Sequence, residues 1–301
     1  MSPKTVIIIT GPTASGKTEL AIEVARHFNT SIISADSRQC FRELNIGVAK
    51  PSQEQLSAVN HFFVNSHSIR EEMNAVIFES LAMQWCEEIF STRDTLVISG
   101  GTGLYIKAFR EGLDEIPVID EGIRGKIIDN YRERGISWLQ KSVQQSDPLF
   151  YESGEMTNPQ RMMRALEVIQ STGRSIISYR KQQKKQKNFR VLEFGIRVPR
   201  NELYQRINLR VDKMMDAGLL EEVASLLPYQ HLNALQTVGY SELFENLRGM
   251  SGLEESVSRI KQNTRHYAKR QITWMNKNEN LIWMDDEYKK KILEIFVGLK
   301  I

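Results

Sequence analysis

Cysteine is scarce in this sequence. Its 301 residues include only Cys40 and Cys86, too few for the disulfide framework of a small secreted protein and typical of a reducing compartment. Long hydrophobic runs are missing too. The first apolar stretch, residues 6–9, is shorter than a signal-peptide core and far below the ~20 residues that a membrane-spanning helix needs. We therefore expect a cytoplasmic protein without membrane association.

Low-complexity tracts and internal repeats are also absent. Hydrophobic residues make up 41% of the chain and charged residues 26%, values that exclude a collagen-like or disordered protein. At roughly 150 residues per domain, this length corresponds to about two folding units.

The charge is unevenly distributed, although the formal net charge is only +3. Residues 156–210 hold 13 Lys and Arg against 3 Asp and Glu, and residues 259–277 hold 6 Lys and Arg with no acid. Such asymmetry favours a polyanionic partner. The lysines of residues 181–187 are explained equally well as a solvated linker.

The N-terminal part alternates strands with helices. Residues 5–10 are a β-branched run that enters a glycine-rich turn, and residues 18–28 have apolar side chains at helical spacing. Residues 31–35 and 95–99 are predicted strands, and residues 75–90 are a predicted helix. This order predicts an α/β fold, in which a parallel sheet is covered by helices on both faces.

The pattern changes after Gly112. Residues 122–145 and 158–172 are predicted helices with no convincing strand between them, and residues 190–198 return to a strand pattern. A helical insertion into the α/β core explains this change. The predicted domains are residues 1–113 with 189–301, the core, and residues 114–188, the insertion.

A phosphate-binding motif follows the first predicted strand. Residues 11–18 read G-P-T-A-S-G-K-T and match G-x-x-x-x-G-K-[ST] between strand and helix, so the sheet is expected to be P-loop NTPase-like. Backbone amides and a helix N-terminus would face one anion, Lys17 would add a charge, and the Thr18 hydroxyl would ligate Mg²⁺. The predicted phosphate contacts are Gly11, Thr13, Ala14, Ser15, Gly16, Lys17 and Thr18.

An acid is missing where nucleotide-hydrolysing P-loop enzymes need one. The strand at residues 95–99 runs into G-G-T-G, whereas the strand at residues 31–35 is followed by Asp36. Ligands bind at the carboxyl ends of strands in open α/β sheets, so we expect Asp36 and Thr102 to converge on the phosphate loop. From spacing alone, Asp36 can be a metal ligand, a proton acceptor or a helix cap.

Eight motifs in chain order carry a family resemblance. They are G-P-T-A-S-G-K-T at 11–18, A-D-S-R-Q at 35–39, G-V-A-K-P at 47–51, G-G-T-G-L-Y at 100–105, R-M-M-R-A-L-E-V at 161–168, R-V-D-K-M at 210–214, V-G-Y at 238–240 and T-R-H-Y-A-K-R-Q-I-T-W at 264–274. Together they resemble the tRNA dimethylallyltransferase (tRNA isopentenyltransferase) family over about nine-tenths of the chain.

The resemblance implies a prenyl transfer. The dimethylallyl group of dimethylallyl diphosphate would move to the exocyclic amine of adenosine 37, just 3′ of the tRNA anticodon, and diphosphate would leave. The phosphate loop would hold the prenyl diphosphate instead of a nucleotide, with Mg²⁺ as the cofactor. The resemblance also favours a monomer and tRNAs that read codons beginning with uridine.

The resemblance implies roles for individual residues. Asp36 would accept the amine proton, and Lys17, Arg210 and Thr102 would stabilise the leaving diphosphate. Without the resemblance, Arg210 is a solvated helix residue. The base would be extruded from the anticodon loop and read at its edge. The residues assigned to that reading are Asp36, Ser37, Arg38 and Gln39, with Thr102 beside them.

Contacts to the rest of the anticodon arm are expected from basic segments. The resemblance implies Arg124, Gln160, Arg161, Met162, Met163 and Arg164. Charge alone suggests Lys269 and Arg270 as phosphate contacts, whereas Trp274 on the same predicted helix is expected to be a core residue.

Two rival functions share some of these features. A small-molecule or nucleotide kinase uses the same loop but requires ATP, and a non-catalytic RNA-binding module would be indifferent to loss of Asp36. A zinc site built from His61, His67 and a cysteine lacks suitable ligand spacing.

Overall fold

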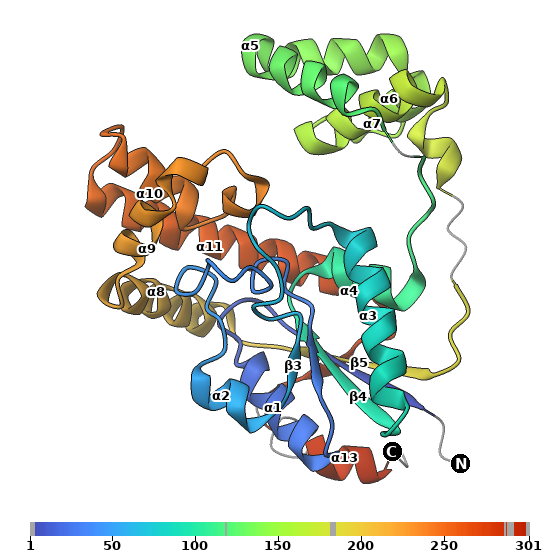
Figure 1. Ribbon diagram of the computed structural model, residues 1–301, viewed down its shortest axis with the longest axis vertical. Helices are drawn as coiled ribbons and strands as arrows, with labels where there is room; N and C mark the ends of the chain where they lie inside the picture. Colours follow the sequence, from blue (N-terminus) through green and yellow to red (C-terminus); the bar gives the residue numbers. More distant parts are fainter. Residues whose placement is uncertain (1–3, 118, 181–184, 286, 288–291, 299–301) are drawn as a thin grey trace. The chain divides into compact units, whose positions relative to one another are not determined.

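A parallel sheet forms the centre of the larger part of the chain. The computed structural model describes residues 4–117, 119–180, 185–285, 287 and 292–298 (Figure 1). Within them the sheet has six strands in the order β3-β2-β4-β1-β5-β6. The strands are β1 (Thr5–Thr10), β2 (Ile32–Ser34), β3 (His61–Phe62), β4 (Thr95–Gly100), β5 (Arg190–Ile196) and β6 (Ile282–Met284).

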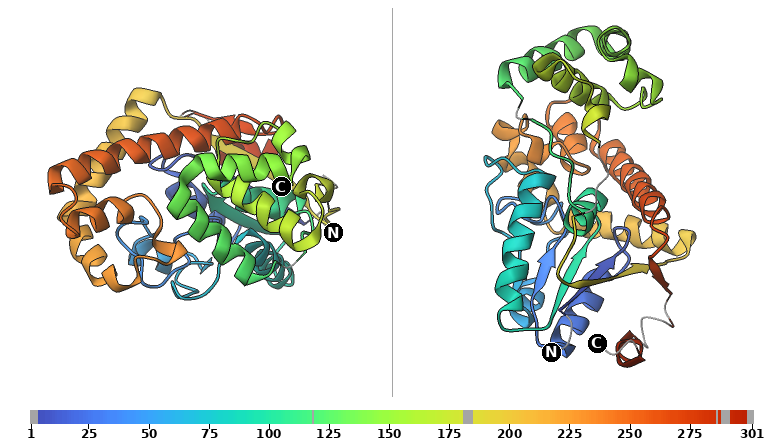
Figure 2. Two further views of the ribbon diagram at one scale, coloured as in Figure 1. Left: turned by 90° about the horizontal axis from the view of Figure 1, so that it is seen from above. Right: turned by 90° about the vertical axis from the view of Figure 1, so that its right-hand side faces the viewer.

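The central strands are buried on both faces, because helices cover each side. All six residues of β1 and of β4 are buried, as expected for continuous apolar strands in a parallel sheet. Ile7 and Ile9 of β1 belong to a core cluster with α1 and Phe296 of α13, and intervening residues face the other side. There α3 and α4 lie (Figure 2, right), joined by a stack of Phe78 on Tyr105 at 4.4 Å.

The helices of this part come in two groups. The N-terminal group consists of α1 (Lys17–His27), α2 (Gln53–Ala58), α3 (Ala75–Phe90) and α4 (Gly103–Glu111). The C-terminal group consists of α8 (Arg200–Asp216), α9 (Leu219–Ser225), α10 (Tyr240–Leu247), α11 (Leu253–Met275) and α13 (Ile292–Gly298), with short 3₁₀ turns η2 (Leu227–Tyr229) and η3 (Asn233–Leu235).

The chain divides into two compact units, residues 1–110 with 186–301 and residues 111–185. The second unit contains α5 (Glu121–Ser146), α6 (Pro148–Glu152), α7 (Pro159–Thr172) and the 3₁₀ turn η1 (Ile176–Tyr179). Its own core includes Leu139, Val143 and Phe150. The backbone N–H of Lys185 donates to the carbonyl of Glu111 at 2.9 Å, so this unit begins and ends at neighbouring points.

The predicted elements agree with the structure except for short ones. The predicted strands and the helices at residues 75–90 and 158–172 are confirmed within one or two residues. The helix predicted at residues 122–145 forms as α5 but bends at Gly135, where φ is 71°. The short elements α2 and β3 were not predicted. The linker lysines Lys181 and Lys184 lie outside the described residues.

No helix in the described part of the chain is both long and apolar enough to cross a membrane.

Candidate active site

The phosphate loop connects β1 to α1. Ala14 has a φ of 65°, a strained conformation for alanine that clusters at ligand sites. Ser15 Oγ is buried and, among the described residues, has no hydrogen-bond partner, although buried polar groups are nearly always paired. A phosphate oxygen in the loop would supply that partner, so the loop fits a bound anion.

Two cationic side chains stand at this loop. Burial lowers the pKa of Lys17 from 10.5 to about 8, an effect that Asp36 opposes and Arg210 increases. Arg210 of α8 donates from Nη1 to Thr13 Oγ1 at 3.3 Å. Burial lowers its pKa as well, against the opposite effect of Glu19. Both groups are poorly solvated, so a diphosphate would gain from binding between them.

Asp36 and Thr102 follow the ends of β2 and β4 and are linked through Ser37. Asp36 Oδ1 accepts from the backbone N–H of Arg38 at 2.9 Å and of Gln39 at 3.4 Å. The backbone N–H of Ser37 donates to Thr102 Oγ1 at 3.1 Å. The two strand ends approach so closely that any Cβ at Gly100 would overlap the Ala35 carbonyl. Asp36 therefore caps its own turn, and its charge still acts on Lys17, whose pKa it raises.

Gln39 is already hydrogen-bonded within the protein. Its Nε2 donates to the carbonyls of Val48 at 3.4 Å and Ala49 at 3.1 Å, and its Oε1 accepts from Ser34 Oγ at 3.2 Å. To pair with an adenine edge, Gln39 would have to exchange these bonds. In the free protein it holds the loop of residues 47–51 beside Asp36.

These groups surround a cavity of about 740 Å³ at the carboxyl ends of β1 and β2. Its lining includes most of the predicted site residues, namely Thr13, Ala14, Ser15, Gly16, Lys17, Thr18, Asp36, Ser37, Arg38, Gln39, Arg210 and Arg270. Gly11 lies behind the loop, where a Cβ would come within 2.5 Å of Ser15 Oγ. Thr102 is joined to the cavity through Ser37, and Lys269 is exposed outside the lining.

Helix α11 supplies one wall of this cavity. Tyr267 and Arg270 line it, with the Arg270 guanidinium 5.7 Å from the centre of the Tyr267 ring. Burial raises the pKa of Tyr267 to about 12, so its phenol stays protonated at neutral pH. Trp274 packs against Gly103 at the start of α4 but is only half-buried, so it is less enclosed than the expected core residue.

Gln271 of the same helix is a site residue that sequence reasoning missed. Its Oε1 accepts from the backbone N–H of Thr13 at 2.9 Å, and its Nε2 donates to the Gly101 carbonyl at 2.9 Å. One amide thus joins the phosphate loop to the turn that carries Thr102. The Y-A-K-R-Q motif contains Gln271, but the sequence does not reveal its hydrogen-bond partners, which lie up to 258 residues away along the chain.

The site offers oxygen atoms that can bind a metal ion, but the described residues do not surround such an ion by themselves. Thr18 and Asp36 line one small recess together with Lys17 and Gln39. Groups of three or more His, Cys, Asp or Glu arranged for a metal are not found in the described residues. A hydroxyl and a carboxylate beside a phosphate site fit Mg²⁺, which is commonly held by few protein oxygens and by substrate phosphates.

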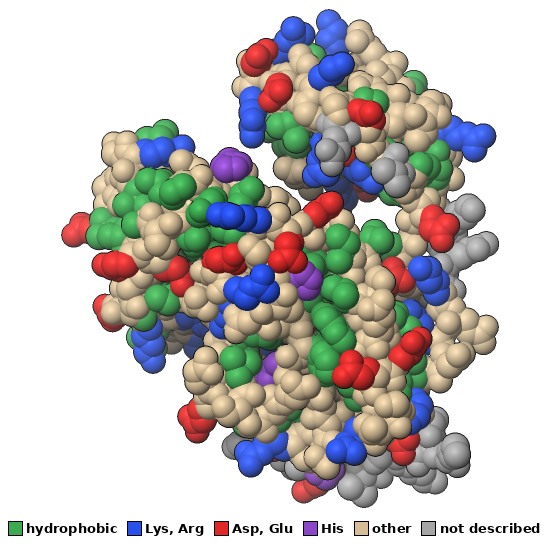
Figure 3. Space-filling model, in the orientation of Figure 1, with side chains coloured by type: hydrophobic (Ala, Val, Ile, Leu, Met, Phe, Trp, Pro, Cys, Tyr) green, Lys and Arg blue, Asp and Glu red, His purple; other side chains and the backbone are tan. Residues whose placement is uncertain are grey.

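Three of the arginines predicted to contact tRNA, Arg124, Arg161 and Arg164, lie on the separate helical unit and are paired with acids. Arg161 Nη1 lies 3.2 Å from Glu155 Oε1. Glu167, nearly fully buried, accepts from Arg164 at 3.0 Å and lies 3.7 Å from Arg124 Nε. Lys and Arg side chains are spread over the visible face of this unit, with acids among them (Figure 3).

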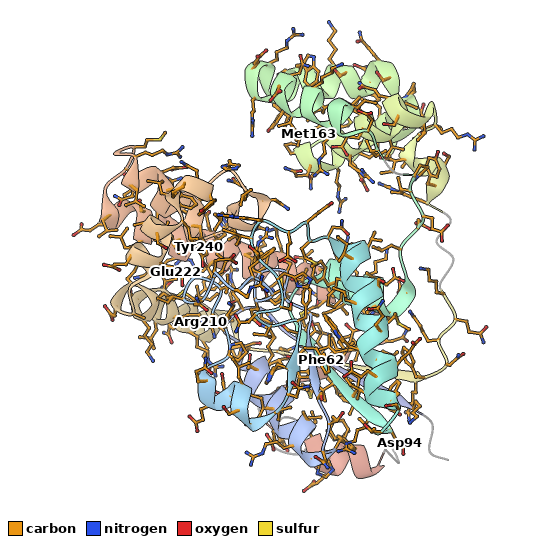
Figure 4. All side chains as sticks on the ribbon, in the orientation of Figure 1. Phe62, Asp94, Met163, Arg210, Glu222 and Tyr240 are labelled. Carbon is orange, nitrogen blue, oxygen red and sulfur yellow. The ribbon has the colours of Figure 1, made fainter. Side chains whose placement is uncertain are left out.

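The prediction for Met162 and Met163 needs correction. Their side chains are 0% and 6% exposed and belong to the core of the helical unit, where Figure 4 labels Met163. A side chain in that core cannot touch RNA unless the unit opens. Gln160 and Arg161, in contrast, are exposed.

Comparisons with known proteins point to one family. The model of the IPP transferase family matches residues 39–278. A tRNA dimethylallyltransferase of Christiangramia forsetii is 45% identical over 96% of this chain and 96% of its own length. A tRNA dimethylallyltransferase 1 of Bacteroides thetaiotaomicron is 42% identical over 96% and 94%.

Solved structures are similar as well. The crystal structure of a tRNA isopentenylpyrophosphate transferase from Bacillus halodurans superposes with a TM-score of 0.71 at 32% identity, covering 99% of this chain and 96% of that one. A eukaryotic dimethylallyltransferase acting on tRNA shares the fold, with a TM-score of 0.78 at 23% identity over 99% and 80%. With its family model matched over most of its length, the chain belongs to the IPP transferase family.

Proposed function

We propose that this protein is a tRNA dimethylallyltransferase. It transfers the dimethylallyl group of dimethylallyl diphosphate to the exocyclic amine of adenosine 37, next to the anticodon, in tRNAs that read codons beginning with uridine. The observation that carries the proposal is the meeting of one carboxylate, Asp36, with a strained phosphate loop and two poorly solvated cations around one cavity.

The reaction needs two complementary groups, and the cavity contains both. As the amine nitrogen forms its bond to the allylic carbon, its proton passes to Asp36. The bond from that carbon to the diphosphate oxygen breaks, and the electron pair stays on the departing diphosphate. Lys17, Arg210 and the loop amides stabilise that charge. Thr102 Oγ1 accepts from the Ser37 N–H at 3.1 Å and donates to Ser37 Oγ at 3.5 Å, and it would redirect this weak donation to the departing oxygen.

A divalent cation is part of the proposal. Thr18 would hold Mg²⁺ together with the diphosphate, at the recess that it lines with Asp36. When bound, the ion neutralises phosphate charge. Lys17 and Arg210 act on the departing diphosphate, and Asp36 acts on the proton of the amine.

The tRNA would reach this site as an anticodon arm whose target base is extruded. Arg270 at the cavity, and Lys269 beside it, are the candidates for contacts to nearby phosphates. Arg124, Gln160, Arg161 and Arg164 are the candidates on the helical unit. The family resemblance favours a monomer, and we expect a cytoplasmic enzyme because Cys40 and Cys86 are both unpaired and buried.

The test is to incubate the purified protein with unmodified tRNA, Mg²⁺ and labelled dimethylallyl diphosphate in the absence of ATP. Label in a prenylated adenosine, located by nucleoside mass spectrometry, supports the proposal. A strict requirement for ATP would favour the kinase instead. Full retention of activity by Asp36→Ala would contradict the catalytic assignment.

A further inference from the structure

The carboxylate of Glu222 on α9 is bound by four donors. Its Oε2 accepts from the backbone N–H of Asn45 at 3.0 Å and of Ile46 at 2.8 Å, and its Oε1 from that of Gly47 at 3.1 Å. The Tyr240 hydroxyl donates to Oε1 at 2.6 Å. Figure 4 labels Glu222 and Tyr240 close together, where α9 meets α10. Hydrogen bonds to an ionised acceptor are about twice as strong as neutral ones.

Three successive amides that point at one anion form a concavity of the kind that binds phosphate. Here the anion is part of the protein, a side chain 175 to 177 residues further along the chain. The concavity is therefore filled, and it is no second phosphate site. Its effect is to fix residues 45–47 to the C-terminal helices.

The fixed loop forms one wall of the cavity. Gly47, Val48, Ala49, Lys50 and Pro51 line it. At Gly47 a Cβ would lie 2.5 Å from the Tyr240 ring, so the loop approaches the helix as closely as the backbone allows.

This wall is tied to the residues beside Asp36. The carbonyls of Val48 and Ala49 accept from Gln39 Nε2. Lys50 Nζ donates to the Phe41 carbonyl at 2.6 Å and to Asn45 Oδ1 at 3.2 Å. A shift of the wall would therefore move the segment after β2, which bears the proposed proton acceptor. No hydrogen bond in the described residues links Glu222 to the phosphate loop directly.

From this we infer that Glu222, supported by Tyr240, is a positioning residue for the acceptor nucleoside. It holds the wall of residues 47–51 and, through Gln39, the segment that faces the purine. The inference rests on the proposed function. It assigns Glu222 to tRNA use and not to prenyl diphosphate binding, which distinguishes it from a general stabilising contact.

The test compares Glu222→Gln with Glu221→Gln. In Glu222→Gln, the N–H donors of the new amide face at least one of the three backbone N–H groups, which then loses its acceptor. Glu221 precedes Glu222 on the same helix and is exposed, so Glu221→Gln is the control. We expect Glu222→Gln to lower kcat/KM for tRNA about tenfold to a hundredfold. The KM for dimethylallyl diphosphate and inhibition by inorganic diphosphate should stay unchanged, and Glu221→Gln should match the wild type.

A second variant covers the case in which Glu222→Gln folds poorly. Tyr240→Phe keeps the ring against Gly47 and removes one donor of four. The kcat/KM for tRNA should therefore fall by less than in Glu222→Gln, and the KM for dimethylallyl diphosphate should again stay unchanged. Wild-type kinetics in Glu222→Gln, or equal losses toward both substrates in folded Tyr240→Phe, would overturn the inference. An inactive wild type would instead refute the proposed function.

Discussion

Replacing Asp36 with asparagine tests the proton-acceptor role with little change in structure. The carbonyl oxygen of asparagine can accept the two backbone hydrogen bonds that Asp36 Oδ1 receives, at 2.9 and 3.4 Å. The amide nitrogen beside it cannot take up a proton from the attacking amine. Loss of a general base costs roughly 10²- to 10⁴-fold in rate. We therefore expect kcat to fall by about that factor while the Kd for tRNA stays unchanged.

The assay is single-turnover prenylation of saturating tRNA, with filter binding in the absence of prenyl diphosphate for the Kd. Because Asp36 raises the pKa of Lys17, which is about 8, the variant lysine loses its proton at lower pH. Measurements at about pH 6.5, well below the wild-type value, minimise the difference in Lys17 charge between the two proteins, so the comparison reports mainly the missing base.

Asp120→Asn is the matched control. Asp120 Oδ1 accepts from the backbone N–H of Gly122 at 2.7 Å and of Ile123 at 3.2 Å, the same type of turn at the start of α5. This variant should keep the wild-type kcat. A kcat within about tenfold of wild type for Asp36→Asn, below the range for losing a general base, would refute the reasoning, as would equal losses in the two variants.

Three further predictions concern the anion site, the RNA contacts and the fold. Prenyl diphosphate affinity should fall as pH rises through about 8, because Lys17 then loses its charge; isothermal titration at pH 7 and 9 checks this, and Lys17→Met should abolish the dependence. Arg161→Ala with Arg164→Ala should reduce the slope of log K against log salt for tRNA by about 1 to 2, and an unchanged slope excludes both as phosphate contacts. Gln271→Met leaves two backbone groups unpaired and should lower the free energy of unfolding in urea by about 2 kcal/mol, more than Gln140→Met, which removes one bond.

Local patterns were sufficient for much of the fold. The β-branched run of β1 and the apolar spacing of α3 predict those elements because burial on a sheet or helix face follows the repeat of the backbone. The dipeptide strand β3 carries no periodic signal, since two residues cannot show alternation. Helix α2 has no buried residue and lacks the apolar stripe by which a helix is recognised.

The site was predictable where function follows from a short motif, and not where it depends on distant contacts. The phosphate loop and Asp36 stand at strand ends, which the order of elements reveals. Glu222 and Gln271 look like ordinary helix residues until folding brings backbone groups of distant loops to them. Motif matching also treated Met162 as a contact, although its spacing on α7 places it in the core.

The hydrogen bond between Lys185 and Glu111 also bears on how this architecture can be re-engineered. Since the chain leaves the sheet-bearing unit and re-enters it at adjacent positions, a short turn could bridge the gap without displacing β4 or β5. Excision would then give a smaller protein that retains its anion pocket. The excised four-element bundle, with a core of its own, could be grafted onto another scaffold as a portable module.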